Sequence, residues 1–363
     1  MASHVIPQPD EQTWRVVGDQ PLRIGIIGAG MFAATSHLPA LRECPGVEVT
    51  CACRTREAKL KRFCETFGVP RGYTDHREML ARERLDGVVV ASTHDLHFAH
   101  AMDCLERGIP VLLEKPMTLT MADADALLAR TRETRLPVVI GYNRHWWPCY
   151  VRAREMIQGG QLGEPRVLIG EYCGDLEWAI ARDAESNYGR SEAFYEAGDP
   201  PNFRGDWEKS GGGFFIDAGT HIAEVICWLI DDDPVLVHAV MDSRGHETDL
   251  DGLVSVRFRS GTLATIYFMG SAKAHAGSGV TVYGSGGTLI ARHDSELHFA
   301  PEGELLPIAD LPEKSHPAHN FVAVLRGTAT PACTVADGRR AVALVSAAYQ
   351  SASEGAAVET ALA

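Results

Sequence analysis

Apolar and polar positions follow two different periods in the first part of the chain. Five short apolar runs have the length and the flanking turn residues of buried strands. They are Leu22–Gly28, Val47–Cys53, Gly87–Ala91, Pro110–Leu113 and Pro137–Tyr142. The segments between them, such as Arg56–Phe67 and Met121–Thr134, space their apolar residues as one face of a helix does. This alternation of strand and helix predicts a doubly wound parallel sheet.

The pattern changes after Tyr142, where strands begin to follow one another directly. An apolar helix is expected at Ala218–Ile230 and a last helix at Val335–Glu354. Between these helices, strand-like runs occur at Val235–Met241, Gly252–Arg259, Thr262–Met269, Val280–Tyr283 and Thr288–Ala291. Serial strands with tight turns predict an antiparallel sheet. We expect an arm over residues 1–20, a parallel-sheet domain over residues 21–142, and an α+β domain with an open, mostly antiparallel sheet over residues 143–363.

Composition and charge narrow the class of protein. The 363-residue chain has a net charge of −14, which argues against a nucleic-acid or anionic-membrane surface because either needs a basic patch. No apolar run approaches the ~20 residues of a bilayer span, and Met1–Gln20 lacks the features of a secretory signal. The nine cysteines form no CxxC pair and no zinc-like spacing with histidine. We therefore expect reduced thiols, no metal site and a cytoplasmic location.

One face of the second sheet is expected to be apolar and therefore buried. Apolar residues alternate in Val254–Phe258 and Leu263–Phe268. An open antiparallel sheet with an apolar face has to bury that face against something. We expect it to meet another subunit, which predicts a homodimer or homotetramer.

A glycine-rich turn follows the first predicted strand and opens a helix. Gly28, Gly30 and Ala33 give the pattern GxGxxA. The first glycine permits a tight turn, the second lets a pyrophosphate approach the backbone, and the small third residue packs the helix closely. The N–H groups at the start of the helix, near Met31 and Phe32, suit the phosphates. The turn therefore indicates an NAD(P)-binding Rossmann domain.

The end of the second strand bears on the choice of cofactor. An NAD-specific site usually has an acidic residue there for the ribose 2′-OH. This chain has Arg54, Thr55 and Arg56 instead. A guanidinium matches a phosphate bidentately, and a threonine can add a hydrogen bond. We expect NADP to be preferred, with NAD as the open alternative.

Two further segments complete a recognisable set of motifs. Leu112–Pro116 reads Leu-Leu-Glu-Lys-Pro at a strand end, and Gly211–His221 reads GGGFFIDAGTH. With the glycine loop, in this order and spacing, they resemble the Gfo/Idh/MocA family of glucose–fructose oxidoreductase, myo-inositol dehydrogenase and their relatives. The resemblance runs from about Leu22 to Val358 and includes the Gly141–Arg144 stretch.

The resemblance implies an oxidoreductase that moves a hydride between a nicotinamide and the CH–OH/C=O carbon of a sugar, sugar derivative or cyclitol. It implies catalytic roles for Lys115, Asp217 and His221. Residues four apart on a helix share a face, a histidine titrates near neutral pH, and a lysine stabilises a developing alkoxide. We expect His221 as the acid–base, Lys115 as orienter and stabiliser, and Asp217 as a hydrogen-bond partner of the substrate. Whether Lys115 or His221 takes the proton stays open.

Other residues are assigned by their position relative to these motifs. Further cofactor contacts are expected at Ser92, Thr93, His94, His97, Glu114, Lys115 and Asn143. Further substrate contacts are expected at Arg144, Arg204 and Trp207, although a structural role of Arg144 is an equal alternative. The family usually has a proline and an asparagine where this chain has Thr93 and His94, so the chain departs from the family pattern in the loop on the nicotinamide side.

The region between Gly174 and Ser210 combines aromatic and polar residues. Its aromatic members are Trp178, Tyr188, Phe194, Tyr195, Phe203 and Trp207. Aromatic faces with polar neighbours suit a small-molecule carbohydrate or cyclitol, and anchoring of a loop is the alternative. His275 and Tyr283 are further candidates for the substrate cleft. Two other functions remain open: redox-neutral, NAD-dependent cleavage of glycosides, and a non-enzymatic ligand-binding protein.

Overall fold

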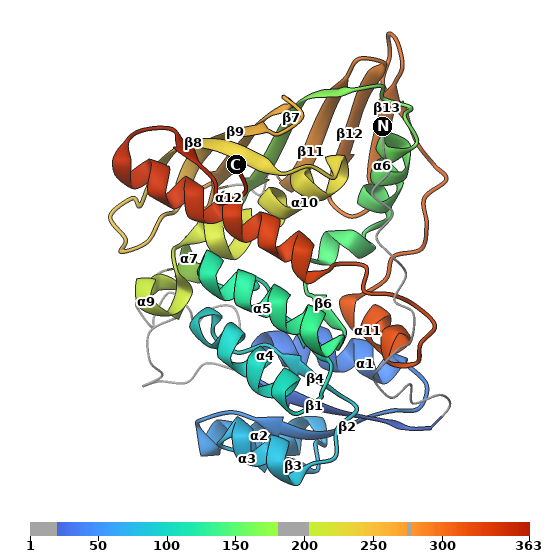
Figure 1. Ribbon diagram of the computed structural model, residues 1–363, viewed down its shortest axis with the longest axis vertical. Coiled ribbons are helices and arrows are strands. Elements are labelled where there is room, and N and C mark those ends of the chain that lie inside the picture. The colour runs from blue at the N-terminus through green and yellow to red at the C-terminus, as the bar shows by residue number, and fades with distance from the viewer. Residues whose placement is uncertain (1–19, 181–202, 274–276) are drawn as a thin grey trace.

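The protein is described from a computed structural model over residues 20–180, 203–273 and 277–363 (Figure 1). The expected N-terminal arm, apart from Gln20, lies outside the described residues. So do Tyr188, Phe194, Tyr195 and His275 among the candidate substrate-binding residues.

A six-stranded parallel sheet forms the first half of the fold. Its order is β3-β2-β1-β4-β5-β6, the order of a doubly wound dinucleotide-binding sheet. The strands are β1 (Leu22–Ile27), β2 (Val47–Cys53), β3 (Arg71–Tyr73), β4 (Gly87–Val90), β5 (Val111–Leu113) and β6 (Val138–Ile140). Five of them match the predicted runs. The sixth, β3, was not predicted because its three residues carry no apolar run.

Helices connect these strands in the predicted alternation. They are η1 (Ala33–His37), α1 (Leu38–Glu43), α2 (Glu57–Phe67), α3 (His76–Arg82), η2 (His94–Leu96), α4 (His97–Glu106) and α5 (Met121–Thr134). The chain later returns to this half, because Ala318, Phe321 and Leu325 of α11 (Pro317–Leu325) belong to the same buried cluster as the parallel sheet. The predicted division at residue 142 therefore separates the two sheets but not every helix.

The second half is built on a nine-stranded, mostly antiparallel sheet, as predicted. Its order is β14-β13-β12-β11-β7-β10-β9-β8-β15. The strands are β7 (Pro165–Cys173), β8 (Pro234–Asp242), β9 (Asp251–Phe258), β10 (Leu263–Met269), β11 (Gly277–Gly284), β12 (Gly287–Arg292), β13 (Glu296–Ala300), β14 (Leu306–Pro307) and β15 (Val358–Glu359). The central strand, β7, was not predicted. It pairs parallel with β10 and antiparallel with β11.

One face of this sheet is covered by helices of the same chain. The covering helices are α6 (Pro148–Gln158), α10 (Thr220–Ile230) and α12 (Val335–Glu354). Figure 1 shows α12 lying between the nine-stranded sheet and α5 of the first half. The two halves therefore share α12 as a common layer.

The structure corrects the predicted interface face of this sheet. The alternating residues Val254, Val256 and Phe258 are buried in the chain's own core, as are Ile266 and Phe268. Successive side chains of a strand point to opposite faces of the sheet, and these residues lie on the face that the helices cover. The exposed apolar residues of the opposite face are Val167, Val240, Leu253, Leu263, Met269 and Tyr283. If a second subunit covers this sheet, it contacts that opposite face.

One helical stretch of the described residues is long and apolar enough to cross a membrane by composition alone. It runs over Trp207–Ile230, and 83% of its most apolar window is buried inside the protein. This stretch contains α10, which lies under β7, β10 and β11. Its apolar character therefore belongs to the core of the second half.

Candidate active site

The turn after β1 has the geometry that the glycine pattern predicts. Gly28 has a φ of 89°, and a Cβ there would overlap the backbone of Ala91 and Ser92, so only glycine fits. A Cβ on Gly30 would find only one atom within 4 Å, the carbonyl oxygen of Gly28, so the loop is open on that side. Phe32 is 42% exposed, and Ala33 is buried at the start of η1. A cradle of this shape fits the predicted dinucleotide pyrophosphate.

Arg54 lies at the edge of this turn. Its Nη1 donates to the carbonyl oxygen of Ala29 at 2.9 Å, which fixes the guanidinium beside the glycine loop. Thr55 and Arg56 follow it and are exposed at the start of α2. The three residues thus occupy the position where a ribose 2′-substituent is expected in this fold.

Lys115 and Asp217 meet at the carboxyl edge of the parallel sheet. Lys115 follows β5, and its Nζ donates to Oδ1 of Asp217 at 3.1 Å and to the backbone carbonyl of Asp217 at 2.6 Å. Arg204 donates from Nε to the other carboxylate oxygen at 3.0 Å. Burial favours the neutral acid, but the charges of Arg204 and Lys115 outweigh it and hold the pKa of Asp217 well below its usual value. Asp217 is therefore a carboxylate shared by two cations.

His221 lies one turn further along. Asp217 is part of the π-helical turn η5 (Phe215–Gly219), and His221 is the second residue of α10. Desolvation of the ring, then the charges of Arg144 and Lys115, lower the pKa of His221 well below its usual value. The ring lies edge-on to Tyr142, and its buried Nδ1 has no hydrogen-bond partner in the described structure. The predicted catalytic set is thus brought together, with His221 as a neutral imidazole.

His94 lies on the same side of the site. Its Nδ1 is 3.0 Å from the carbonyl of Ser210 and donates to it, and its Nε2 lies 3.6 Å from Oδ1 of Asp217. Burial lowers the pKa of His94, although Asp217 opposes this effect. The sequence assigned His94 to the cofactor. The structure places it beside the carboxylate of Asp217, against the ring of Phe203.

His97 ties two loops of the site together. Its Nδ1 lies 2.7 Å from the carbonyl of Pro116 and its Nε2 lies 3.1 Å from the carbonyl of Ser92. Ser92 also bonds His100 through its hydroxyl at 2.9 Å. Since the ring is almost fully buried between the loops that follow β4 and β5, its position fixes the turn that carries Lys115. Thr93 lies between these groups, next to η2.

The carboxylate of Glu114 is held by hydrogen bonds at both of its oxygens. Its Oε1 bonds Nε2 of His37 at 2.8 Å, and its Oε2 accepts the backbone N–H of Lys115 at 3.2 Å. A Cβ on Gly141 would overlap this carboxylate. Both carboxylate oxygens are thus used by the protein, so Glu114 is placed to position Lys115.

Asn143 and Arg144 begin the turn η3 (Asn143–Trp146) after β6. Arg144 is only 2% exposed, and its guanidinium donates to Oδ1 of Asn143 at 3.4 Å and to the hydroxyl of Ser278 at 3.2 Å. Trp207, by contrast, is 45% exposed and packs edge-on against Tyr349. The structure thus couples Arg204 to Asp217 and Arg144 to His221 electrostatically, while the ring of Trp207 contacts α12.

The sequence analysis missed Asp249, which holds the glycine triplet in place. Its carboxylate accepts the backbone N–H groups of Gly213 and Phe215 at 2.7 and 2.8 Å and the hydroxyl of Tyr349 at 2.7 Å. These bonds fix the turn that carries Asp217. They join positions more than thirty residues apart, so no local motif could have revealed them.

A cluster of three buried side chains lies on η3, on α10 and just before α12. His145, Glu224 and Cys333 each bring one ligand atom within 4.8 Å of the others, which is close enough to hold a metal ion. His145 donates from Nδ1 to the carbonyl of Ala332 and lies 2.7 Å from Glu224 through Nε2. A proton shared between Nε2 and Oε1 accounts for this contact without a metal, and burial raises the pKa of Glu224. Oε2 of Glu224 is buried and has no hydrogen-bond partner in the described structure. The absence of a metal stays a prediction.

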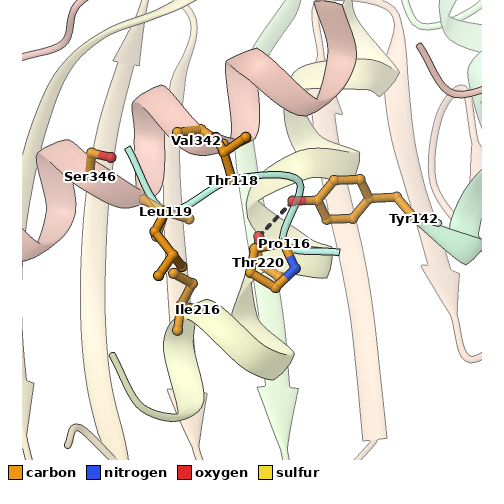
Figure 2. Close-up of a pocket in the computed structure, with 9 residues that line it drawn as sticks. Pro116, Thr118, Leu119, Tyr142, Ile216, Thr220, Val342 and Ser346 are labelled. Carbon is orange, nitrogen blue, oxygen red and sulfur yellow. Dashed lines mark hydrogen bonds between the residues drawn. The ribbon is translucent and has the colours of Figure 1, made fainter. Parts of the chain in front are cut away.

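A small pocket backs the catalytic residues on the side of α12. Figure 2 shows it between the loop after Lys115, the start of α10 and α12, with the hydroxyl of Tyr142 bonded to Thr220. Its lining includes Pro116, Ile216 and Thr220, the sequence neighbours of Lys115, Asp217 and His221. The wall behind the site is therefore mostly apolar, which limits the access of water from that side.

Comparison with known proteins identifies the family. Residues 22–142 match the model described as "Oxidoreductase family, NAD-binding Rossmann fold", and residues 150–290 match the GFO/IDH/MocA C-terminal domain. The chain belongs to the GFO/IDH/MocA family. It is therefore an oxidoreductase with an NAD-binding Rossmann fold, which confirms the resemblance drawn from the motifs.

Relatives agree with this assignment over most of their length. The chain is 28% identical to 1,5-anhydro-D-fructose reductase of Ensifer adhaerens, over 93% of this chain and 98% of that protein. It is 26% identical to myo-inositol 2-dehydrogenase of Thermotoga maritima, over 74% and 75% respectively. The crystal structure of aldose-aldose oxidoreductase from Caulobacter crescentus shares the fold with a TM-score of 0.77 at 21% identity, over 94% of this chain and all of that one.

Proposed function

We propose that this GFO/IDH/MocA oxidoreductase transfers a hydride between a nicotinamide cofactor and the CH–OH/C=O carbon of a sugar, sugar derivative or cyclitol. The observation that carries the proposal is the meeting of Lys115, Asp217 and His221 beside an open glycine turn at the carboxyl edge of the parallel sheet. Ligands bind at this edge in doubly wound folds. The named relatives, a sugar-derivative reductase and a cyclitol dehydrogenase, support the same substrate class.

A bound nicotinamide supplies the hydride acceptor or donor, and the chain supplies the proton chemistry. Lys115 is held by Asp217, so its ammonium is oriented and stabilises the oxygen as it gains negative charge during oxidation. His221 is neutral at pH 7 because its pKa is depressed, so it is free to accept the hydroxyl proton. In the reverse direction the same ring returns the proton to the carbonyl oxygen.

We further propose that NADP(H) is preferred over NAD(H). The support is the position of Arg54 beside the glycine loop, with Thr55 and Arg56 after it and no carboxylate among these three residues. A guanidinium at this place pairs with a 2′-phosphate, whereas an acidic residue would repel it.

The test is an absorbance assay at the nicotinamide band with the purified protein, both cofactors, and a panel of sugars, ketosugars and cyclitols. Oxidation of at least one member, lost in both Lys115→Met and His221→Gln, supports the proposal. Cofactor affinity of His221→Gln serves as the control, since His221 is not among the expected cofactor contacts. If the two variants turn substrate over as fast as the parent protein, the catalytic assignment is wrong.

The two alternative functions receive less support. The relatives named above are reductases and dehydrogenases, which does not favour redox-neutral cleavage of glycosides. A ligand-binding protein without activity is expected to lack the catalytic lysine or histidine. Lys115 and His221 are both in place here.

A further inference from the structure

Arg144 is a buried cation without a carboxylate partner. It is 2% exposed, and its hydrogen bonds to Asn143 and Ser278 are long, at 3.4 and 3.2 Å. Its Nε is buried and has no hydrogen-bond partner, and no carboxylate of the described residues forms an ion pair with it. A buried charge is costly unless it is paired. Among the described residues, the charge of Arg144 is therefore not compensated by a carboxylate of the protein.

A second unpartnered donor lies next to it. The hydroxyl of Tyr150 is buried, and its O–H donates to no acceptor among the described residues. Its charged neighbour is Arg144, which has only donors of its own and whose guanidinium carbon is 6.0 Å from the centre of the Tyr150 ring. Tyr150 is fully buried on α6. A phenol and a guanidinium both donate hydrogen bonds, and a carboxylate has two oxygens to accept them. Water offers the same acceptors but does not neutralise the charge.

Arg144 is electrostatically coupled to the reaction site. Of the charges that lower the pKa of His221, that of Arg144 has the largest effect and that of Lys115 the next largest. Arg144 also lies against the ring of Tyr172 on β7 and the hydroxyl of Ser278 on β11, two neighbouring strands of the nine-stranded sheet. The carboxylate of Asp217 is already shared by Lys115 and Arg204, so it does not compensate Arg144.

Neighbouring aromatic rings explain part of the burial. The guanidinium carbon of Arg144 lies 4.9 Å from the centre of the Trp147 ring and 5.6 Å from that of Tyr172. Cation–π contacts stabilise a desolvated guanidinium, but they leave its N–H groups unsatisfied. The rings therefore orient Arg144 and leave its donors for a ligand.

We propose that the substrate of this enzyme is a sugar acid, an aldonate or uronate, whose carboxylate binds the Arg144 guanidinium and the Tyr150 hydroxyl. The inference rests on the proposed oxidoreductase function and adds the charge of the substrate to it. The hydroxyl that reacts lies at the other end of the sugar, near Lys115 and His221. The pairing of Arg144 with the carboxylate then fixes which carbon of the sugar faces the nicotinamide.

The first experiment uses the unmutated protein with its cofactor. Its melting temperature and turnover are measured with D-glucuronate, D-galacturonate and D-gluconate, and with the uncharged matches D-glucuronamide, D-galactose and D-glucose. We expect a preference of about 10-fold to 100-fold in kcat/KM or in Kd for at least one acid over its match, as a hydrogen-bonded charge commonly gives. Equal or better use of the uncharged compounds overturns the inference and leaves the proposed function intact. Failure to bind any of the acids at millimolar concentration also overturns it.

The second experiment locates the carboxylate. Arg144→Met keeps the bulk of the side chain and removes the charge, Arg144→Lys keeps the charge, and Arg107→Met on the exposed end of α4 is the matched control. We expect Arg144→Met to lower kcat/KM for the acid about 10-fold to 100-fold, mainly through KM, with Arg144→Lys intermediate and the control unchanged. An equal loss on charged and uncharged substrates shows that Arg144 is structural and overturns the inference. Binding of the acids without any turnover supports the anion site and contradicts the oxidoreductase assignment instead.

Discussion

The ammonium of Lys115 bonds Asp217 twice, through its carboxylate at 3.1 Å and through its backbone carbonyl at 2.6 Å. The two residues are 102 positions apart in sequence. Lys115 follows β5 of the parallel sheet, and Asp217 lies in η5, directly before the helix α10 that covers the nine-stranded sheet. The contact therefore joins the loop after β5 to the π-helical turn η5. It ties the two halves of the fold together at that point.

Removing the charge of Asp217 should cost stability as well as activity. In Asp217→Asn, Lys115 and Arg204 face each other without their shared carboxylate, and we expect the free energy of unfolding to fall by about 3 kcal/mol. Urea denaturation measures this. The double variant Lys115→Met/Asp217→Asn should recover part of the loss, because one of the two unpaired cations is gone. Additive losses in the double variant would show that the contact is energetically unimportant.

The pH profile of alcohol oxidation should be flat across neutral pH. The base must be neutral to accept a proton, and desolvation together with Arg144 and Lys115 lowers the pKa of His221 well below 6.5. The rate should therefore fall only on the acid side, below the usual titration range of histidine. Profiles of kcat/KM for the parent protein and His221→Gln measure this. If the acid limb remains in His221→Gln and is lost in Lys115→Met, the proton passes through Lys115.

Arg54 should set the cofactor preference. We expect tighter binding of NADPH than of NADH, and a reversal in Arg54→Asp, since the acid repels a 2′-phosphate and bonds a 2′-hydroxyl. Fluorescence titration gives both Kd values. Arg54→Ala is the control, because it also loses the bond to the Ala29 carbonyl but adds no acid. Tighter NADH binding by the parent protein contradicts the prediction.

Acidification should destabilise the fold before the carboxylates titrate. Burial lowers the pKa of His97, His100 and His316 to about 4 each. The unfolded chain takes up these protons near pH 6.5 and the folded chain does not, so stability present above pH 6.5 is lost as the pH falls toward 4. Urea midpoints at pH 7, 6 and 5 should decrease in that order. His316→Asn, which can still cap α11, should show a smaller decrease, and identical midpoints would refute the prediction.

The exposed face of the nine-stranded sheet should mediate assembly. Leu253 and Val240 lie opposite each other on β9 and β8 and are about 60% exposed, at 59% and 62%. We expect a dimer or tetramer by light scattering at micromolar concentration, and a smaller mass for Leu253→Asp. Leu305→Asp, outside the strands, is the control. A monomeric parent protein rules out this interface.

The parallel half of the fold was predictable because its signals are local. A buried parallel strand is a short apolar run, and Gly28 follows such a run at the point where the backbone requires a glycine. The motif around Lys115 likewise stands at a strand end, where side chains reach a ligand. Local patterns of this kind can be recognised in the sequence without knowledge of the tertiary structure.

The second half was less predictable because its partners are distant. Both faces of β9 and β10 carry large apolar residues. The alternation around Leu253 and Val254 therefore predicted a strand, but it did not tell which face packs against the chain's own helices. The position of His94 beside Asp217 depends on a bond to Ser210, 116 residues away. The support of the glycine triplet by Asp249 is equally non-local. No window of sequence contains both members of such pairs.

The place of β7 in the sheet bears on how the chain is made. It is the central strand, yet both of its neighbours, β10 and β11, are synthesised about 90 residues or more after it. While the ribosome adds residues 174–262, β7 has two unpaired edges, and such edges bind other chains. Its Gly170 packs closely on Ile222 of α10, a helix that emerges before either neighbour. The growing chain therefore gains a cover for one face of β7 before it gains any strand to pair with.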